Sequence, residues 1–285
     1  MQKRLKKLGL ALPILLLAAS LSACSSEAGD TSASASCTPA DLKTVEANTL
    51  TIATGEPAFP PWVEDDAPES GKGFEAAVAY AVAKQLGYTN DQVKWVRTTF
   101  DGAIAPGPKG FDFNIQQYSI TDEREQVVDF SSAYYKSNQA IVTFKGSKIA
   151  SVKSIADLVA AKAKLGAAVA STSLDAVESV LGLKASVFND NAAAVAALKN
   201  KQIDGIVVDL PTAFYLSAVE VENGVIAGQF KNVDGADKGA GLLLANESPI
   251  TACVTSAVDA LRDSGELAAI ETTWLTASAG APVLE

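Results

Sequence analysis

The sequence contains no histidine among its 285 residues. Catalytic sites in which histidine is the general base, such as Ser-His-Asp triads and Cys-His pairs, are therefore excluded. Zinc sites built on histidine are excluded for the same reason. Any acid-base chemistry would depend on carboxylates, and no two of them stand at a spacing typical of a catalytic pair. These absences favour a binding function over an enzymatic one.

Basic residues are also scarce, with 23 Lys and Arg against 33 Asp and Glu. Four of the basic residues lie within positions 1–23, so the rest of the chain has 19 basic and 33 acidic residues, a net charge of −14. No basic patch indicates a nucleic-acid partner, and an acidic surface is repelled by anionic lipid. Any contact with a membrane must therefore depend on something other than attraction between the protein's charged surface and lipid.

The apolar run near the start of the chain, Leu8–Ala19, is too short to span a bilayer comfortably. Basic residues precede it and small residues follow it, as in a signal peptide. It leads to Leu21-Ser22-Ala23-Cys24, which resembles the bacterial lipoprotein lipobox. In that motif the residue matching Cys24 becomes the diacylated N-terminus, which carries palmitate or a similar chain. A plain secretory signal cut near Ala23 is the alternative.

We therefore expect residues 1–23 to be a lipoprotein signal peptide and residues 24–36, rich in Ser and Ala, to be a flexible tether. The protein would be extracytoplasmic and held at the cell membrane by its lipid alone. Two further cysteines, Cys37 and Cys253, remain. An even number of cysteines in an oxidising space usually pairs, so we predict a disulfide, with two free thiols as the alternative.

From Cys37 onward, apolar strand-like runs alternate with segments of helical periodicity. This alternation predicts an α/β protein with parallel sheets covered on both faces. We expect strands at 50–53, 94–96, 111–115, 139–144, 165–169, 205–208 and 241–245, and helices at 74–86, 154–163, 192–198, 250–263 and 265–275, with others near Thr172 and Pro211.

The segment Asn114–Arg124 is the most informative part of the sequence. We expect a helix to begin at Thr121, a good N-cap, with Arg124 in its first turn. A cation is disfavoured there by the helix dipole, so this arginine is a candidate clamp for a small carboxylate. The alternative is a surface arginine paired with Asp122 or Glu125.

Two other places suit a small zwitterion. Ser171-Thr172-Ser173 lies between a predicted strand and a predicted helix, where hydroxyl and N–H groups can hold an anion, although it could serve only as an N-cap. Asp209 follows the apolar run 206–208, at the strand end where ligands of α/β sheets bind. Its carboxylate suits an ammonium group; otherwise it caps the helix that Pro211 begins.

These motifs occur together in one family. Over about 235 residues the chain resembles the extracytoplasmic solute-binding proteins of ABC importers, in the polar amino-acid group called family 3. The matching motifs are Gly73-Phe74-Glu75, Ser119-Ile120-Thr121 with Arg124, Val128-Asp129-Phe130-Ser131, Tyr134-Tyr135, Ser171-Thr172-Ser173, Ala197-Leu198-Lys199, Ile203-Asp204, Val208-Asp209, and Gly265-Glu266-Leu267 with Trp274.

The resemblance implies a two-lobe periplasmic-binding-protein fold of type II that closes on its ligand about a hinge of two crossing strands. The crossings would lie near Asn138–Val142 and Asp237–Gly241. Lobe one would comprise residues 37–139 and 240–285, and lobe two residues 140–239.

The resemblance also assigns roles to residues. Arg124 would bind the ligand α-carboxylate bidentately, which a lysine could not copy, with help from Ser119 and the backbone around Gln117. Asp209 would bind the α-ammonium group. Further contacts would come from Thr172 and Ser173, from Phe59 and Phe100 as flanking aromatic rings, and from Glu56 as a further carboxylate.

Some of these assignments have alternatives. Phe59 and Phe100 could be ordinary core residues, and Glu56 an exposed loop carboxylate. Gln116 and Gln117 stand where the family often has small residues, so their amides could narrow the site or bond a polar ligand side chain. The ligand itself is therefore not identified by the resemblance.

We expect a monomeric receptor that needs no cofactor, captures an amino acid or similar zwitterion, and delivers it to a membrane permease. Two alternatives remain open. A dehydratase or lyase on the same fold would need Glu56, Asp101 or Asp209 as its acid or base. A lipoprotein that senses its ligand without a transporter would use the same cleft.

Overall fold

The computed structural model describes residues 36–231, 238–275 and 281–285. Strands in these ranges form two five-stranded sheets, ordered β2-β1-β3-β10-β4 and β7-β6-β8-β5-β9. Cys24, together with most of the predicted tether and the whole predicted signal peptide, lies outside the described residues. Within the described part of the chain, no helix is both long enough and apolar enough to cross a membrane.

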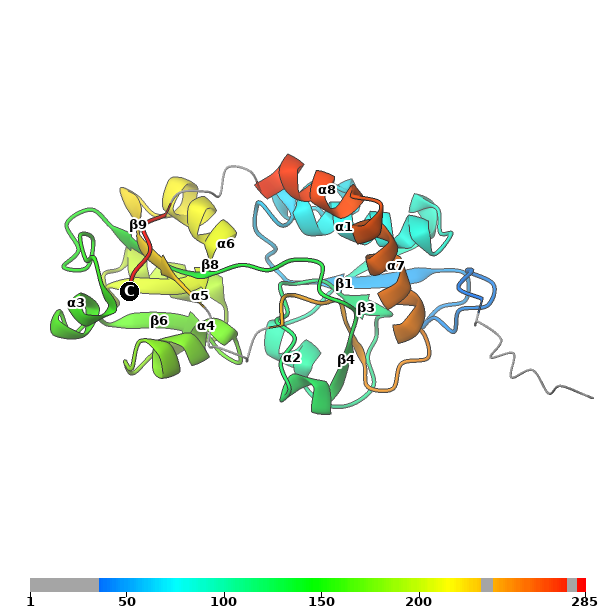
Figure 1. Ribbon diagram of the computed structural model, residues 1–285, viewed down its shortest axis with the longest axis horizontal. Helices are drawn as coiled ribbons and strands as arrows, with labels where there is room; N and C mark the ends of the chain where they lie inside the picture. Colours follow the sequence, from blue (N-terminus) through cyan, green and yellow to red (C-terminus); the bar gives the residue numbers. More distant parts are fainter. Residues whose placement is uncertain (1–35, 232–237, 276–280) are drawn as a thin grey trace, which may run out of the picture. The chain divides into compact units, whose positions relative to one another are not determined.

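The first sheet is built from residues on both sides of the second in the sequence. Its strands are β1 (Leu50–Thr54), β2 (Val93–Arg97), β3 (Phe113–Asn114), β4 (Val128–Phe130) and β10 (Leu243–Ala245). Three helices pack against one another beside this sheet: α1 (Phe74–Gln85), α7 (Thr251–Asp263) and α8 (Glu266–Leu275). Their buried side chains share one core with those of β1 and β3 (Figure 1). The short α2 (Phe100–Ile104) follows β2.

The second sheet consists of β5 (Gln139–Phe144), β6 (Leu165–Ala168), β7 (Ser186–Phe188), β8 (Gly205–Asp209) and β9 (Gly224–Phe230). Its helices are α3 (Ile155–Ala160), α4 (Thr172–Asp175), α5 (Asn191–Lys199) and α6 (Leu210–Tyr215). Alternate residues of a strand face opposite sides. Thus Val207 of β8 packs in one core and Ile206 and Val208 in another, which explains why this strand is a continuous apolar run.

Both sheets are mixed, whereas we predicted parallel sheets. In the first, β10 runs antiparallel to β3 and β4. In the second, β5 runs antiparallel to both β8 and β9. The reason is topological: a chain that enters a sheet at β5 and leaves it at β9 runs in opposite directions on the two passages. Strand β9 was also absent from our prediction, because its two glycines weaken the apolar signal of Gly224–Phe230.

The chain crosses from the first sheet to the second just before Gln139 and returns after Phe230. The two crossing segments are adjacent at both ends, since Tyr135 forms an antiparallel bridge with Ala240, and Gln139 pairs with Phe230. The first crossing thus precedes most of the segment Asn138–Val142 that we predicted, and Asp237 lies outside the described residues.

Residues 281–285 return to the second sheet, although we grouped 240–285 with lobe one. Val283 forms a parallel bridge with Gln229, and the Leu284 side chain is 3 % exposed within a core of the second sheet. The backbone oxygen of Glu285 accepts a hydrogen bond from the Ile155 N–H, 3.2 Å away. These contacts attach the end of the chain to the sheet that α8 does not cover.

The predicted disulfide is confirmed: Cys37 is bonded to Cys253, which lies in α7. The bond ties the start of the described chain to the helical layer of the first sheet. Cys253 is 5 % exposed and belongs to the same apolar core as α1.

Candidate ligand-binding site

A cavity of about 90 Å³ is lined by residues from both sheets. Four strands, β1, β3, β6 and β8, end beside it, as expected for a ligand site at the carboxyl ends of strands. Its lining residues are Thr54, Gly55, Pro57, Ala58, Phe59, Trp62, Phe100, Gln116, Gln117, Ala168, Ser171, Thr172, Ser173, Asn191, Val208, Asp209 and Thr212. Six of the residues predicted for the site are among them: Phe59, Phe100, Gln117, Thr172, Ser173 and Asp209.

Arg124 lies behind this wall and is 7 % exposed, so it is not the surface arginine of our alternative. Its Nη1 donates to the Ser119 carbonyl oxygen at 2.8 Å, and its Nη2 donates to the Ala170 carbonyl oxygen at 2.7 Å. Its guanidinium carbon lies 5.6 Å from the centre of the Phe100 ring, within cation–π range. Asp122 and Glu125 instead form ion pairs with Lys238.

The helix predicted to begin at Thr121 is a single 3₁₀ turn, Arg124–Gln126. The Thr121 Oγ1 accepts a hydrogen bond from the Arg124 N–H at 3.2 Å, but the residue directly before the turn is Glu123, so Thr121 is not its N-cap. The turn cannot extend, since β4 begins two residues after it and pairs with β10. A single 3₁₀ turn has little dipole to disfavour Arg124, contrary to our expectation, and what distinguishes this arginine is its burial.

A hydroxyl group from the loop after β3 and one from α4 meet beside Arg124. The Ser119 Oγ and the Thr172 Oγ1 are 3.2 Å apart. Ser171 is the N-cap of α4, with its Oγ accepting from the Leu174 N–H, so the N-cap reading of this motif is confirmed and its binding of an anion stays a prediction. Ser173 is turned inward, and its Oγ donates to the Gln139 Oε1 at 2.6 Å.

Asp209 is the last residue of β8 and stands directly before α6. Its side chain makes no capping hydrogen bond to that helix. Instead, its Oδ1 accepts from the Gln139 Nε2 at 2.7 Å, so one glutamine orients both Ser173 and Asp209. The carboxylate is thus held at the cavity wall rather than used as a helix cap.

Glu56 is exposed and does not line this cavity. It lines a second cavity of about 450 Å³ that shares four wall residues with the first: Pro57, Phe59, Phe100 and Gln116. Two other carboxylates, those of Asp101 and Asp190, also line the second cavity. Glu56 is therefore a neighbour of the candidate site and not part of its wall.

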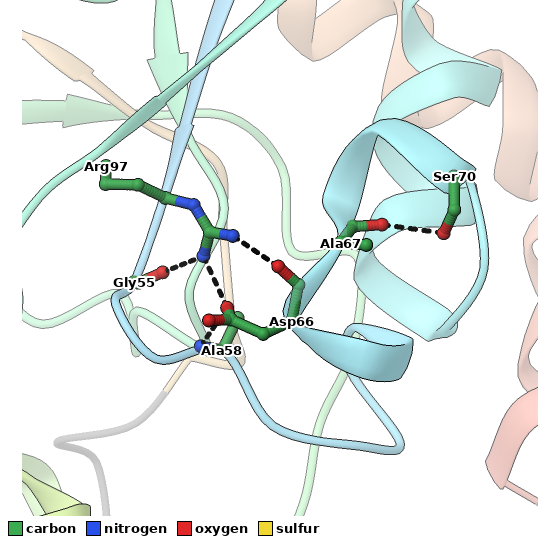
Figure 2. A network of polar contacts seen from close by, with 6 residues as sticks. All are labelled: Gly55, Ala58, Asp66, Ala67, Ser70 and Arg97. Atoms are coloured by element: carbon green, nitrogen blue, oxygen red, sulfur yellow. Dashed lines mark hydrogen bonds and ion pairs between the residues drawn. The ribbon is translucent and has the colours of Figure 1, made fainter.

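The segment that carries Glu56 is held by Arg97, at the end of β2 (Figure 2). The Arg97 guanidinium donates to the carbonyl oxygens of Gly55 and Asp66, and its Nη1 lies 2.7 Å from the Asp66 Oδ1. That carboxylate in turn accepts from the Ala58 N–H at 2.9 Å. The network fixes the backbone of the loop that forms one side of the cavity.

A buried carboxylate supports the other side. Glu75, in the first turn of α1, is 0 % exposed. Its Oε1 accepts from the Gln117 N–H at 2.7 Å and from the Tyr134 hydroxyl, and its Oε2 accepts from the Gln117 Nε2. Burial raises the pKa of Glu75 to about 7, against the opposing effect of these hydrogen bonds. Gln117 has a left-handed φ of 51° and its amide is occupied by Glu75.

Sequence reasoning missed Trp62 and Thr212, which connect the segment before α1 to α6. The Trp62 Nε1 donates to the Thr212 Oγ1 at 2.7 Å, and both residues line the cavity. Gly73 makes the position of Trp62 possible. It has φ 103°, and a Cβ there would overlap the Trp62 carbonyl oxygen, which accepts from the Glu75 N–H at 2.9 Å. A glycine before an amphipathic helix was the only available signal.

The family profile of bacterial extracellular solute-binding proteins, family 3, matches residues 50–277. The chain belongs to this family. The L-cystine-binding protein TcyJ of Escherichia coli (strain K12) is 28 % identical to this family 3 protein over 238 residues, 82 % of this chain and 85 % of TcyJ. A probable histidine-binding protein of Campylobacter jejuni is 31 % identical over 166 residues, 58 % of this chain, and the match spans 61 % of that protein's length.

Solved structures show the same fold. An ancestral arginine-binding protein bound to glutamine superimposes on this family 3 protein with a TM-score of 0.65 and 29 % identity, over 81 % of this chain and 99 % of that one. The predicted two-lobe α/β fold of type II periplasmic binding proteins is thereby confirmed. As a family 3 protein, the chain is a solute-binding protein. Among the described residues, no group of three histidine, cysteine or acidic side chains could hold a metal ion.

Proposed function

We propose that the protein is the substrate-binding lipoprotein of an ABC importer and that it captures an amino acid or a similar small zwitterion by closure of its two lobes. The observation that carries this proposal is the position of Arg124. This buried guanidinium bonds a carbonyl on each side of the cleft, that of Ser119 and that of Ala170. Its donors are thus aimed at the place where the two lobes meet.

A ligand carboxylate would compete with these carbonyl oxygens for Arg124. A carboxylate accepts a stronger, charge-assisted hydrogen bond than a neutral carbonyl, and its two oxygens match the planar guanidinium. The Ser119 and Thr172 hydroxyl groups, 3.2 Å apart, would complete the carboxylate site. Since Arg124 and Ser119 lie between β3 and β4 of the first sheet and Thr172 lies in α4 beside the second, all of them can contact the ligand only when the lobes are closed.

Asp209 would take the ammonium group, again from the second sheet. A zwitterion would therefore bridge Arg124 of lobe one and Asp209 of lobe two. Its binding energy would favour the closed arrangement, because only that arrangement offers both charges at once. A permease could then distinguish the loaded protein from the empty one.

The relatives support an amino acid as the ligand: one is a cystine-binding protein, one is a probable histidine-binding protein, and the ancestral protein holds glutamine. We also propose that the protein performs no chemistry on its ligand, since the cavity wall carries a single carboxylate, Asp209, among the described residues. Lipid attachment at Cys24, the extracytoplasmic location and the monomeric state belong to the same proposal.

The test is a ligand screen on protein that has been unfolded and refolded to remove any carried ligand. Each of the twenty amino acids and related zwitterions is added, and the midpoint of thermal unfolding is measured. A ligand at about 100-fold above its dissociation constant adds about 2.7 kcal/mol. For a chain of this size we expect a rise of roughly 5–10 °C.

The binding mode is then tested with Arg124→Lys and Asp209→Asn, and with Arg262→Lys as the control. Arg262 lies on α7 and pairs with Asp259 on the surface. We expect Arg124→Lys to weaken binding by about 100-fold, through loss of bidentate charge-assisted bonds, and the control to change nothing. No shift with any amino acid would refute the proposed ligand class, and unchanged affinity in Arg124→Lys would refute the role of that residue.

A further inference from the structure

One buried hydroxyl in the cavity wall has no partner within the described residues. Thr54, the last residue of β1, is 1 % exposed and lines the cavity, and its Oγ1 makes no hydrogen bond there. A buried polar atom without a partner costs free energy, so such atoms are few in folded proteins. An orphan hydroxyl in the wall of a ligand site marks a place where a ligand can supply the missing bond.

Two side-chain amides, those of Gln116 and Asn191, share the cavity wall with Thr54. Gln116 reaches along the wall toward Gly55, where an added Cβ would lie 2.5 Å from the Gln116 Nε2. The Gln116 Oε1 accepts from the Tyr118 hydroxyl at 2.9 Å, which turns the Nε2 to the Gly55 side. Asn191, at the start of α5, contributes a second amide to the lining. Asp209 is the one ionisable side chain among the lining residues that the structure describes.

We propose that the ligand's side chain is uncharged and ends in a hydrogen-bonding group, as a carboxamide does, and that it is bound by Thr54 and Gln116. This inference rests on the proposed function, because Arg124 and Asp209 are then occupied by the carboxylate and ammonium groups common to all amino acids. The end of the ligand that varies is left to Thr54, Gln116 and Asn191. Glutamine and asparagine are the amino acids whose side chains end in a carboxamide, which can bond both groups at once.

The alternatives are disfavoured on physical grounds. A cationic or anionic side chain in this cavity would be buried without a counter-charge, which is expensive. An aliphatic side chain would leave the Thr54 hydroxyl unpaired, and sites built to bond a polar group reject analogues that lack one. A carboxamide offers both a donor and an acceptor, and so can satisfy a hydroxyl and an amide together.

The second cavity offers a competing destination for a long cationic side chain, because Glu56, Asp101 and Asp190 line it. Asp190 is already engaged, since its Oδ1 accepts from the Ala193 N–H at 2.7 Å as the N-cap of α5. A side chain would have to pass the shared wall formed by Phe59, Phe100 and Gln116. Binding of arginine or lysine would show that this route is open.

The experiment measures dissociation constants of glutamine, asparagine, leucine, arginine, lysine and glutamate by calorimetry, for the wild type and for Thr54→Val, Thr54→Ser and Thr51→Val. Thr51 is a matched control: it lies on the same strand, is 3 % exposed, and also has an unpartnered Oγ1 among the described residues, but it does not line the cavity. Valine has the shape of threonine without the hydroxyl, so both variants retain the packing.

We expect glutamine or asparagine to bind at least about tenfold more tightly than the other four amino acids. Thr54→Val should weaken the binding of that ligand by about three- to tenfold and leave the affinity for leucine unchanged. Thr54→Ser and Thr51→Val should retain wild-type affinity. Tightest binding of arginine, lysine, glutamate or leucine would overturn this inference and leave the proposed function standing. An equal loss for all ligands in Thr54→Val would also overturn it. Failure of every amino acid to bind would overturn both.

Discussion

Glu75 should make the stability of this protein depend on pH in the neutral range. Its carboxyl group is wholly buried beneath Gln117 and Tyr134, and its pKa is raised from 4.5 to about 7 because burial disfavours the charged form. The nearby carboxylate of Asp209 acts in the same direction. The three hydrogen bonds donated to Glu75 by Gln117 and Tyr134 oppose the rise without cancelling it.

The direction in which stability changes with pH depends on whether the folded or the unfolded state binds the proton more tightly. Below pH 4.5 Glu75 is protonated in both the folded and the unfolded chain, and its contribution to stability is fully present. Between pH 4.5 and 7 the unfolded chain loses the proton while the folded protein keeps it, so stability falls as the pH rises. At 1.36 kcal/mol per pH unit, this interval amounts to about 3 kcal/mol, a large part of a typical 5–15 kcal/mol.

The perturbation is Glu75→Gln, which keeps the size of the side chain and removes its proton equilibrium. Urea unfolding of the variant and the wild type is followed at several values from pH 4.5 to 8. The difference in unfolding free energy isolates Glu75, because all other titrating groups are common to both proteins. We expect the variant to gain about 3 kcal/mol relative to the wild type across this range, with a plateau above pH 7.

Glu69→Gln provides the control, since Glu69 is an exposed glutamate in the segment before α1. Measured over the same range, it controls for the loss of one negative charge at the surface. A constant difference for Glu75→Gln would refute the reasoning, because the buried carboxyl would then titrate alike in both states. A difference of the opposite sign would show that the hydrogen bonds outweigh the burial.

Two further predictions concern contacts between distant parts of the chain. Cys37 and Cys253 are 216 residues apart, so their disulfide closes a long loop. Replacing both by alanine should lower the free energy of unfolding by about 5 kcal/mol and leave ligand affinity unchanged. Equal stability of variant and wild type in urea unfolding would contradict this prediction. Trp62→Phe and Thr212→Val, combined in a double-mutant cycle of unfolding free energies, should show a coupling of about 1 kcal/mol from their buried hydrogen bond, and strictly additive effects would argue against that bond.

Local sequence patterns predicted most of the elements but few of the long-range contacts. Helical periodicity and a following glycine located α1, and the run Ile206-Val207-Val208 located β8. The strand–helix alternation did not reveal that β5 pairs with β8 and β9 in antiparallel fashion, because pairing direction depends on the path of the chain and not on any one segment. Strand β9 was missed because its two glycines weaken its apolar signal. Its pairing with β5, which the segment itself does not indicate, holds it in the sheet.

In the candidate site, too, local sequence patterns predicted some residues, whereas those placed by long-range contacts were missed. Asp209, Thr172 and Ser173 were predicted from their place at strand ends, and the structure puts them on one cavity wall. Glu75 was read only as part of a helix-opening motif, since nothing local indicates that it will be buried under Gln117, 42 positions away. Which residues reach the cavity depends on tertiary contacts, and so Glu56, adjacent in sequence to two lining residues, falls outside it.

The two ends of the described chain are attached to different sheets. The disulfide fixes Cys37 to α7 beside the first sheet, whereas Val283 forms a bridge with Gln229 of β9 and Leu284 is buried in a core of the second sheet. Two fluorophores placed next to these attachment points would each be attached to one lobe without an intervening flexible segment. Energy transfer between them would then report the separation of the two lobes directly, and closure as proposed above would make the labelled molecule an optical sensor for its own ligand.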